Sequence, residues 1–312
     1  MTTSPIALPD NTTQDRTKGI LLAAFATALF SAKGIFIKLA YQYQVDSVTL
    51  MSLRMLFSLP VYLALGAWGW HQGWLSSQLL KRHGIPIAGI GLLGYYGASF
   101  FDLWGLEYVP AQLERLVLFA YPTFTVLLSW WWMKQRPTRQ MFWILPITWA
   151  GVAVMVGHDL KQQGQHILLG TGLVATSAVI FAFYMVFSKP LINKVSSAAF
   201  TIVAMVAASI GILLHYLFSQ PNLLVITQQP LPVYGYGLII ALFCTVLPSF
   251  MFSDAIRLVG PDKTSVTGSL GPVCTAIAAV LILGEPFTIW HLLGTAMVVV
   301  PITFMAVTKS KH

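Results

Sequence analysis

Residues 19–42 read GILLAAFATALFSAKGIFIKLAYQ, and this stretch decides the fold class of the chain. Lys33 and Lys38 are its only charged residues. At a rise of about 1.5 Å per residue, a helix of this length covers the roughly 30 Å hydrocarbon core of a bilayer. The stretch therefore predicts a helix that crosses a membrane.

The composition of the whole chain points the same way. Of its 312 residues, 56% are hydrophobic and only 9% are charged, and the mean hydropathy is +0.74. A soluble domain carries about a quarter charged residues, so most of this surface does not face water. Cys244 and Cys274 both lie in apolar runs and predict no disulfide framework. We therefore expect an all-α polytopic membrane protein.

Apolar stretches long enough to cross the bilayer follow one another along the chain. We predict ten spans, at residues 19–42, 47–69, 85–108, 111–133, 139–157, 167–189, 197–219, 233–257, 262–284 and 286–308. Residues 1–18 are polar and lack the apolar core of a secretory signal. They predict a disordered cytosolic tail.

Basic residues in the predicted loops set the orientation. An even number of spans puts both termini on one side, and thirteen Lys and Arg lie on that side: Arg16, Lys18, Lys81, Arg82, Lys134, Arg136, Arg139, Lys189, Lys194, Arg257, Lys263, Lys309 and Lys311. The opposite loops carry only Lys161. The positive-inside rule then predicts both termini in the cytoplasm and a cytoplasmic (inner) membrane location. Because the net charge of +8 is largely explained by topology, nucleic acid is not an expected partner.

The chain contains an internal repeat at a shift of 151 residues. The matches are Gly19 with Gly170, Leu22 with Leu173, Ala24 with Ala175, Phe30 with Phe181, Phe36 with Phe187, Lys38 with Lys189, Ser58 with Ser209, and Pro110 with Pro261. Each copy holds five predicted spans, an odd number, so the second copy must enter the membrane from the opposite side. This pattern predicts two inverted five-helix repeats, residues 19–157 and 167–308, as in many secondary transporters.

Several of these segments also give the chain a family resemblance. They are Phe30-Ser31 with Phe36-Ile37-Lys38, Leu53-Arg54, residues 105–111 (GLEYVPA) and Leu283-Gly284-Glu285-Pro286. With this order and spacing, the chain resembles the ten-span EamA-type branch of the drug/metabolite transporter superfamily. The resemblance implies a central cavity between two five-span halves, alternating access, and export of amino acids or other small metabolites. One departure is Lys134-Gln135-Arg136-Pro137, where the family pattern places Glu in the middle.

Five ionisable residues fall deep within the predicted spans of the first repeat: Lys33, Arg54, Asp102, Glu114 and Arg115. Such groups are costly in hydrocarbon and usually face a cavity or a partner. Their counterparts at the same shift are uncharged, namely Tyr184, Met205, Ser253, Ser265 and Val266. Restriction to one repeat favours an asymmetric substrate with a carboxylate, and with an amine as a further candidate group. Ion pairs that only tie helices together are the alternative.

Polar and aromatic residues extend this predicted substrate site. Tyr95, Ser99 and Asp102 share one helical face, and Glu114 shares another with Tyr121. Tyr184 is a deep aromatic residue that could contact a substrate, with core packing as the alternative. Helix kinks beside the substrate path are expected at three positions, Pro122, Gly271 and Pro272, although packing alone could also account for them.

Together these features predict a secondary transporter that moves a small zwitterionic or anionic metabolite by alternating access, with amino-acid export as the leading candidate. The sequence contains no GxxxxGK[ST] loop of the kind that would indicate transport driven by ATP. Proton coupling would fall to Glu114 or Asp102. The alternative is a membrane-embedded enzyme or sensor that uses the central cavity. No nucleophile set or metal-ligand spacing suggests an enzyme, a metal or a cofactor. The expected partners are a small-molecule metabolite and the lipid bilayer. The choices of substrate, direction and coupling ion, and of monomer or homodimer, stay open at this stage.

Overall fold

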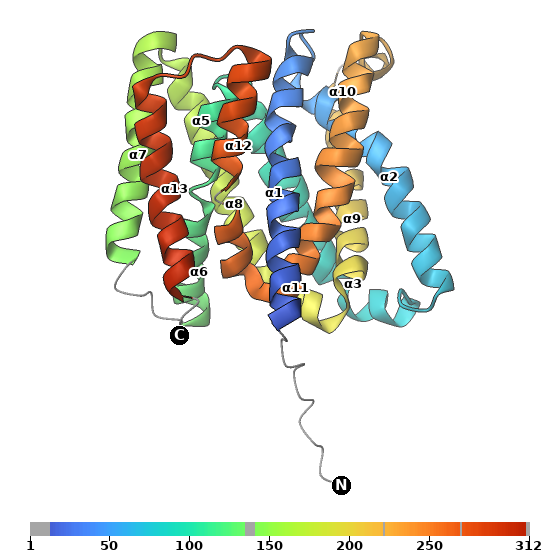
Figure 1. Cartoon of the computed structure of the whole chain (residues 1–312). Helices are drawn as coiled ribbons and strands as arrows, with labels where there is room; N and C mark the ends of the chain where they lie inside the picture. The colour runs from blue at the N-terminus through green and yellow to red at the C-terminus, as the bar shows by residue number, and fades with distance from the viewer. Residues whose placement is uncertain (1–12, 135–140, 221, 269, 310–312) are drawn as a thin grey trace.

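The computed structural model describes residues 13–134, 141–220, 222–268 and 270–309. Within these ranges the chain is a bundle of helices without a strand (Figure 1). The first half contains α1 (Thr13–Tyr41), α2 (Ser47–His71), α3 (Ser77–Gly91), the π-helix η1 (Leu92–Ala98), α4 (Ser99–Leu106), α5 (Ala111–Leu118), α6 (Tyr121–Met133) and α7 (Met141–Gln163). The second half contains α8 (His166–Lys194), α9 (Ser197–Ser219), the 3₁₀-helix η2 (Leu223–Thr227), α10 (Leu231–Ala241), the π-helix η3 (Leu242–Val246), α11 (Leu247–Thr267), α12 (Leu270–Ala278), the π-helix η4 (Ala279–Leu283) and α13 (Ile289–Lys309).

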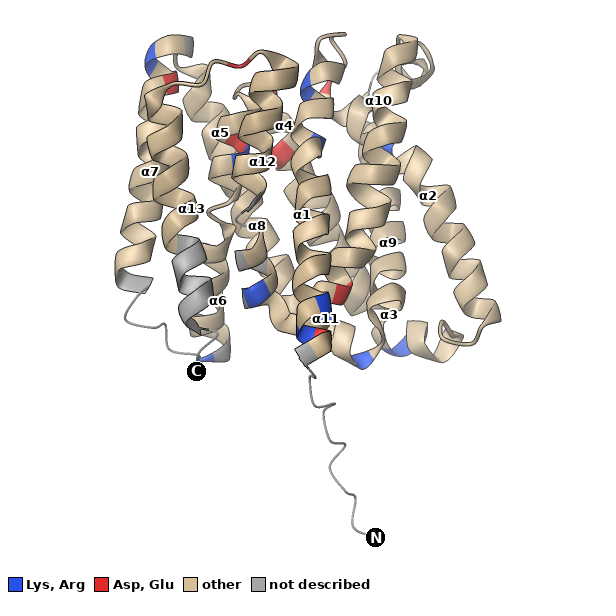
Figure 2. Cartoon of the chain, viewed as in Figure 1, with Lys and Arg blue, Asp and Glu red and all other residues tan. Residues whose placement is uncertain are grey.

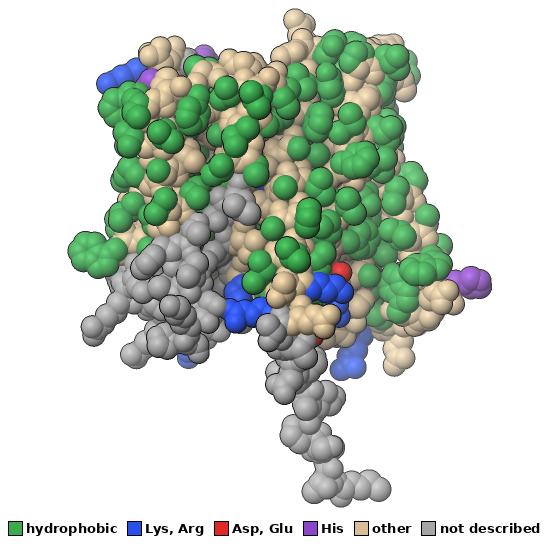
Figure 3. Space-filling model, viewed as in Figure 1, with side chains coloured by type: hydrophobic (Ala, Val, Ile, Leu, Met, Phe, Trp, Pro, Cys, Tyr) green, Lys and Arg blue, Asp and Glu red, His purple; other side chains and the backbone are tan. Residues whose placement is uncertain are grey.

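Membrane-spanning character follows from helix length and composition. In the described part of the chain, 7 helical segments are long and apolar enough to cross a bilayer: Gln14–Tyr41, Ser47–His71, Ser77–Leu106, Trp143–Gln162, His166–Lys194, Ser197–Ser219 and Leu231–Pro261. Two shorter apolar helical segments are Gly271–Leu283 and Ile289–Pro301. Figure 3 shows apolar side chains covering the face of the bundle between its two ends. Exposed apolar surface on this scale is typical of contact with lipid rather than water.

The helix boundaries correct two of the predicted ones. Helix α1 begins at Thr13, inside the predicted 1–18 tail, whose first 12 residues lie outside the described ones. The third span begins at Ser77 rather than at residue 85, because Ser76 caps α3 by accepting a hydrogen bond from the Leu79 backbone N–H at 3.3 Å. The helix therefore includes the charged residues Lys81 and Arg82, which the prediction had placed in the loop before it.

The two halves repeat the same order of elements and pack reciprocally. Helix α1 packs against α11, α10 and α12, whereas its counterpart α8 packs against α4, η1, α3, α5 and α6. Two pairs of counterpart helices pack directly on each other, namely α2 on α9 and α7 on α13. In Figure 1, α1 runs upward and α8 runs downward, so the matched first helices of the two halves are antiparallel. An approximate internal two-fold axis thus relates the halves.

Helix breaks replace two of the predicted continuous spans. Residues 111–133 form α5 and α6, which are separated at Phe119 and Ala120. In the second half, Gly260 has a φ of 83°, and helical geometry resumes after it and ends at Thr267 before α12 begins at Leu270. Pro122 lies in the first turn of α6, and Gly271 and Pro272 lie in the first turn of α12. The predicted kinks are therefore starts of new helices, because proline fits a first turn where no backbone donor is needed.

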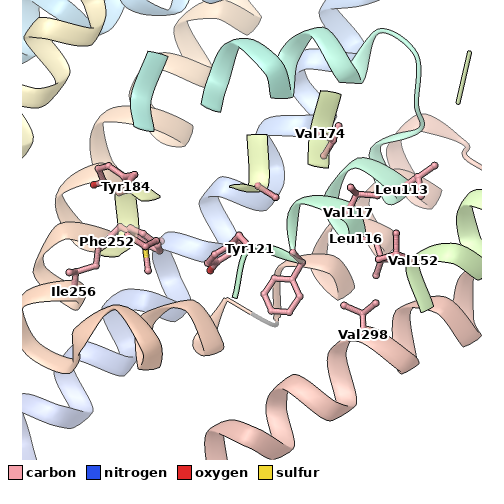
Figure 4. Close-up of a cluster of buried hydrophobic side chains, with 14 of the residues drawn as sticks. Leu113, Leu116, Val117, Tyr121, Val152, Val174, Tyr184, Phe252, Ile256 and Val298 are labelled. Atoms are coloured by element: carbon pink, nitrogen blue, oxygen red, sulfur yellow. The ribbon is translucent and has the colours of Figure 1, made fainter. Parts of the chain in front are cut away.

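The buried core lies between the halves. Figure 4 shows one part of it, in which Leu113 and Val117 of α5 lie near Val152 of α7 and Val298 of α13. Another part joins Tyr184 of α8 to Phe252 of α11. The core thus bridges sequence-distant helices and fixes the position of α5 and α8 beside the bundle centre.

Carboxylates tie helix starts together at the upper end in Figure 1. The Glu285 carboxylate accepts hydrogen bonds from the backbone N–H groups of Ala111 at 2.8 Å and Gln112 at 3.2 Å, at the start of α5. Glu107 accepts from the Ser47 backbone N–H at 3.0 Å, at the start of α2. A negative charge at a helix N-terminus satisfies free backbone donors and complements the helix dipole. The carboxylate of Glu285 therefore joins the second half to the helix that carries Glu114 and Arg115.

Candidate substrate cavity

A cavity of about 110 Å³ lies between the two halves, at the centre of the bundle. A cavity needs only about 10–15 Å³ of such space to hold one water, so this cavity has room for several. Its first-half lining is Thr27, Phe30, Lys33, Arg54, Met55, Gly94, Tyr95, Ala98, Ser99, Asp102, Arg115, Leu118, Phe119 and Tyr121. Its second-half lining is Ser177, Phe181, Met205, Cys244, Thr245, Phe252 and Gly268. All of the charged lining residues come from the first half.

Lys33 and Asp102 form an ion pair on one wall of the cavity. The Lys33 Nζ atom of α1 donates a hydrogen bond to Asp102 Oδ2 of α4, and the two side chains are 12% and 2% exposed. Each charge offsets the desolvation cost of the other, which makes the pair tolerable within the membrane. The second carboxylate oxygen, Asp102 Oδ1, is buried without a hydrogen-bond partner in the described part of the chain.

Arg54 of α2 lines the cavity as a buried cation. It is 3% exposed, and its Nε and Nη2 atoms have no hydrogen-bond partner among the described residues. A buried charged group with unmet donors costs several kcal/mol in general. A guanidinium is suited to a carboxylate or another anion, because its fork of donors matches such a group geometrically.

Arg115 and Glu114 are neighbours on α5 but face different surroundings. Arg115 lines the cavity, and its Nη2 atom donates to Ser31 Oγ at 3.2 Å. Glu114 is 1% exposed and its Oε2 atom lies against Gly34 of α1, 3.2 Å from where a Cβ atom would be. It also interacts with the carboxyl group of Asp102. Glu114 therefore lies behind the cavity wall, next to the acid that forms part of that wall.

The predicted stripe of Tyr95, Ser99 and Asp102 lies along the cavity. Tyr95 belongs to η1, and a π-helical turn at this point rotates the helix relative to a regular α-helix. Tyr184 of α8 is fully buried and does not line the cavity, but its hydroxyl oxygen is 2.7 Å from that of Tyr95. Of the nine predicted binding residues, Lys33, Arg54, Tyr95, Ser99, Asp102, Arg115 and Tyr121 line the cavity, whereas Glu114 and Tyr184 lie one layer behind it.

The helix breaks lie beside this cavity. Phe119 between α5 and α6 contributes to the lining, as does Gly268 after the end of α11. Gly271, in the first turn of α12, lies close to Arg115, because a Cβ atom there would be 3.1 Å from Arg115 Nε. The start of α12 at Gly271 therefore lies next to the charged group of Arg115. A larger residue at Gly271 would require the guanidinium to shift by a few tenths of an ångström.

The second half supplies an apolar wall that the charge pattern did not identify. The Phe252 ring contacts Phe30 and Phe181 at centroid distances of 5.8 and 5.9 Å, and Phe181 contacts Tyr121 at 5.1 Å. Met205 occupies the position that matches Arg54 in the repeat. The internal repeat could have identified these residues from the sequence, since Met205 and Phe181 match the first-half lining residues Arg54 and Phe30. The cavity therefore has a charged wall and an apolar wall.

Comparison with known proteins assigns the chain to a family. The sequence pattern of the EamA-like transporter family matches twice, at residues 17–157 and again at residues 168–307. The chain belongs to the EamA-like transporter family. The two matches agree with the internal repeat that the helix order shows.

Two relatives match over most of the chain. It is 24% identical over 306 residues to the uncharacterized transporter YcbK of Bacillus subtilis, covering 94% of each protein. It is 20% identical over 314 residues to the uncharacterized transporter sll1319 of Synechocystis, covering 93% of this chain and 94% of the relative. One solved crystal structure shares the fold with a TM-score of 0.69 at 18% identity, covering 94% of this chain and 99% of the solved one.

Proposed function

We propose that this EamA-like protein is a secondary transporter that moves a small zwitterionic or anionic metabolite by alternating access, with amino-acid export as the leading case. The observation that carries the proposal is Arg54, a cation that lines the cavity, is 3% exposed, and has no hydrogen-bond partner for Nε and Nη2 within the described residues. An anionic substrate group in the cavity would supply the counter-charge of this guanidinium. Family membership and relatives named as transporters favour transport over the alternative of a membrane-embedded enzyme or sensor.

The proposed topology has ten crossings of the cytoplasmic membrane, with both termini in the cytoplasm. In this scheme α5 with α6, and the end of α11 with α12 and η4, each form one broken crossing. Figure 2 supports the orientation, because Lys and Arg gather at the lower end, where α1 begins. Positive residues are retained on the cytoplasmic side during insertion.

Alternating access in this proposal uses the breaks in the two halves. The break between α5 and α6 and the break before α12 are related by the repeat, and both adjoin the cavity. Discontinuous helices at a repeat interface are a recurring feature of transporter substrate sites. Proton coupling would use Asp102 and Glu114, whose carboxyl groups interact. Two adjacent carboxyl groups readily share one proton, because their charges repel.

The test is substrate counterflow in proteoliposomes. We expect Arg54→Met, which inserts the residue found at the matched position Met205, to reduce amino-acid counterflow by about a hundredfold, since charged hydrogen bonds contribute about 1.5–3 kcal/mol each. Arg82→Met is the matched control, because Arg82 is exposed at the end of α3. Counterflow that is equal in wild type and Arg54→Met would remove the cavity from the mechanism.

A further inference from the structure

The charged groups at the cavity do not balance one another. Among the described lining residues, Lys33, Arg54 and Arg115 are cations, and Asp102 is the single anion. The second half contributes no charged residue to this described lining. Lys33 is paired with Asp102, whereas neither arginine forms an ion pair with a carboxylate in the described part of the chain. Two guanidinium charges therefore remain at the cavity.

Ionisable groups behind the lining do not remove this excess of positive charge. Glu114 interacts with Asp102 and Arg115, and it adds a negative charge only when it is ionised. Lys38 and Glu285 interact with each other, and their charges cancel. The cluster therefore keeps one net positive charge when Glu114 is ionised. It keeps two when the Asp102 and Glu114 carboxyl groups share a proton, as in the proposed coupling.

The three lining cations surround one part of the cavity. The Cys244 thiol of η3 lines the cavity and interacts electrostatically with all three of them. Arg54 comes from α2 and Arg115 comes from α5, and both helices pack against α4, which carries Asp102. The two arginines without an ion pair therefore belong to separate helices around the same space.

The two arginines meet the cavity in different ways. Arg54 is 3% exposed, and its Nε and Nη2 atoms are buried, so it contributes mainly its charge. Arg115 is only partly buried and lines the cavity, and its Nη2 atom donates to Ser31 Oγ at 3.2 Å. Charges in a poorly solvated site within a membrane need counter-charges. A ligand with one carboxylate at Arg115 and a second one toward Arg54 would supply both.

We infer that the cavity takes a small ligand with two carboxylates, one bound by Arg115 and the other balanced by the charge of Arg54. This inference rests on the proposed function, in which the cavity is the substrate site. It sharpens that function from a zwitterionic or anionic metabolite to a dicarboxylate. Acidic amino acids are the members of this class that also carry an amine.

The experiment compares ligands that differ by one negative charge and hardly in shape. Succinate is paired with its monoamide succinamate, and glutamate with glutamine, because an amide replaces one carboxylate in each pair. Binding to the purified full-length protein in lipid nanodiscs is measured by isothermal titration calorimetry at neutral pH. We expect wild type to bind the dicarboxylate at least about tenfold more tightly than its amide, as one additional charge-assisted hydrogen bond would give.

Three variants test the role of Arg115. Arg115→Gln keeps a polar amide and removes the charge, so the preference for the dicarboxylate should fall to about threefold or less, since neutral hydrogen bonds contribute less than charged ones. Arg115→Lys keeps the positive charge, so its preference should exceed that of Arg115→Gln. Arg82→Gln is the matched control and should keep the wild-type preference, because Arg82 is exposed on α3 and does not line the cavity.

The outcomes separate this inference from the proposed function. Equal binding of both members in both pairs by wild type would show that the dicarboxylate site is wrong, while transport of a zwitterion or a monoanion survives. If Arg115→Gln weakens both members of each pair alike, Arg115 has only a structural role and the inference is overturned. It is also overturned if Arg115→Lys restores no preference, or if Arg82→Gln loses it. Binding of no compound from either pair contradicts the inference together with the proposed amino-acid substrate.

Discussion

The two halves of this transporter have nearly the same helix plan and different chemistry at matched positions. Lys33 and Asp102 form an ion pair in the first half, and their counterparts Tyr184 and Ser253 form a hydroxyl interaction in the second. Arg54 faces the cavity from one side, and its counterpart Met205 faces it from the other. Both halves therefore keep a paired contact at these positions, whereas only one wall of the cavity carries charge.

The helix-to-helix contacts explain why the halves can differ in this way. The packing of α1 on α11 includes apolar side chains such as Phe30 and Phe252, and α8 packs on α4 where Gly105 lies against Val174. Such contacts depend on side-chain volume rather than on charge. Charge at the cavity lining instead depends on a ligand or a partner for its stability. Substitutions at the lining can therefore change the ligand chemistry of one half while the bundle is kept.

The largest expected effect comes from converting the first-half pair into the second-half pair. Asp102→Ser alone leaves Lys33 buried without its counter-charge, which should lower the free energy of unfolding by about 3–5 kcal/mol. The double variant Lys33→Tyr with Asp102→Ser should recover most of that loss, because it recreates the Tyr184 and Ser253 contact, yet it should lose transport. Denaturant titration in detergent measures stability, and counterflow measures transport.

Asp254→Ser is the matched control for that experiment. Asp254 lies 3.3 Å from Arg257, accepts a hydrogen bond from the Ser197 hydroxyl, and has a side chain that is 38% exposed, so its loss should cost only about 1 kcal/mol. A double variant that is no more stable than Asp102→Ser would contradict the view that the two pairs are interchangeable structural contacts.

A smaller effect should follow from a difference just before the matched π-helical segments. Gly91 precedes η1 in the first half, and Ala241 precedes η3 in the second. A Cβ atom at Gly91 would lie 2.4 Å from the backbone oxygen of Ala204 on α9, so Gly91→Ala should force the helices apart. The expected loss in the free energy of unfolding is about 1–3 kcal/mol.

Gly89→Ala on the same helix serves as the comparison, because nothing lies within 4 Å of a Cβ atom placed there. We expect it to be neutral or stabilising by up to about 1 kcal/mol from helix propensity. Thermal unfolding of both variants measures the difference. Equal melting temperatures would show that α3 and α9 can move apart freely.

The smallest expected effect concerns Glu285, whose counterpart region in the first half is Lys134-Gln135-Arg136-Pro137. Residues 135–137 of that motif lie outside the described residues. Glu285→Gln keeps an acceptor for the start of α5 but removes the negative charge, so stability should fall by about 1 kcal/mol or less. The exposed charge Lys161, replaced in Lys161→Gln, is the control for a general charge effect. A shift in melting temperature that is equal in both variants would contradict a specific cap.

Parts of the site were predictable because costly residues are conspicuous in an apolar sequence. Lys33, Arg54, Asp102 and Arg115 were found because charged residues rarely occur within membrane spans without a partner or cavity. Their partners were not predictable, since the pairing of Asp102 with Lys33 rather than with an arginine depends on how α1 and α4 cross. Glu114 was placed at the site but lies behind its wall, because adjacent residues on a helix point about 100° apart.

The sequence by itself determined that the protein is helical and membrane-embedded, that it is built from two related halves, and that one half carries the buried charges. These properties follow from hydropathy, repeat spacing and the cost of charge in hydrocarbon, which depend on residue types and their positions in the sequence and not on which helices touch. The tertiary structure decided that the spans beside the site are broken helices, that side chains of the second half complete the cavity lining, and that Tyr95 and Tyr184 are joined by a hydrogen bond. The last two depend on contacts between residues far apart in the sequence, such as Tyr95 with Tyr184, which only the packing of the two halves brings together.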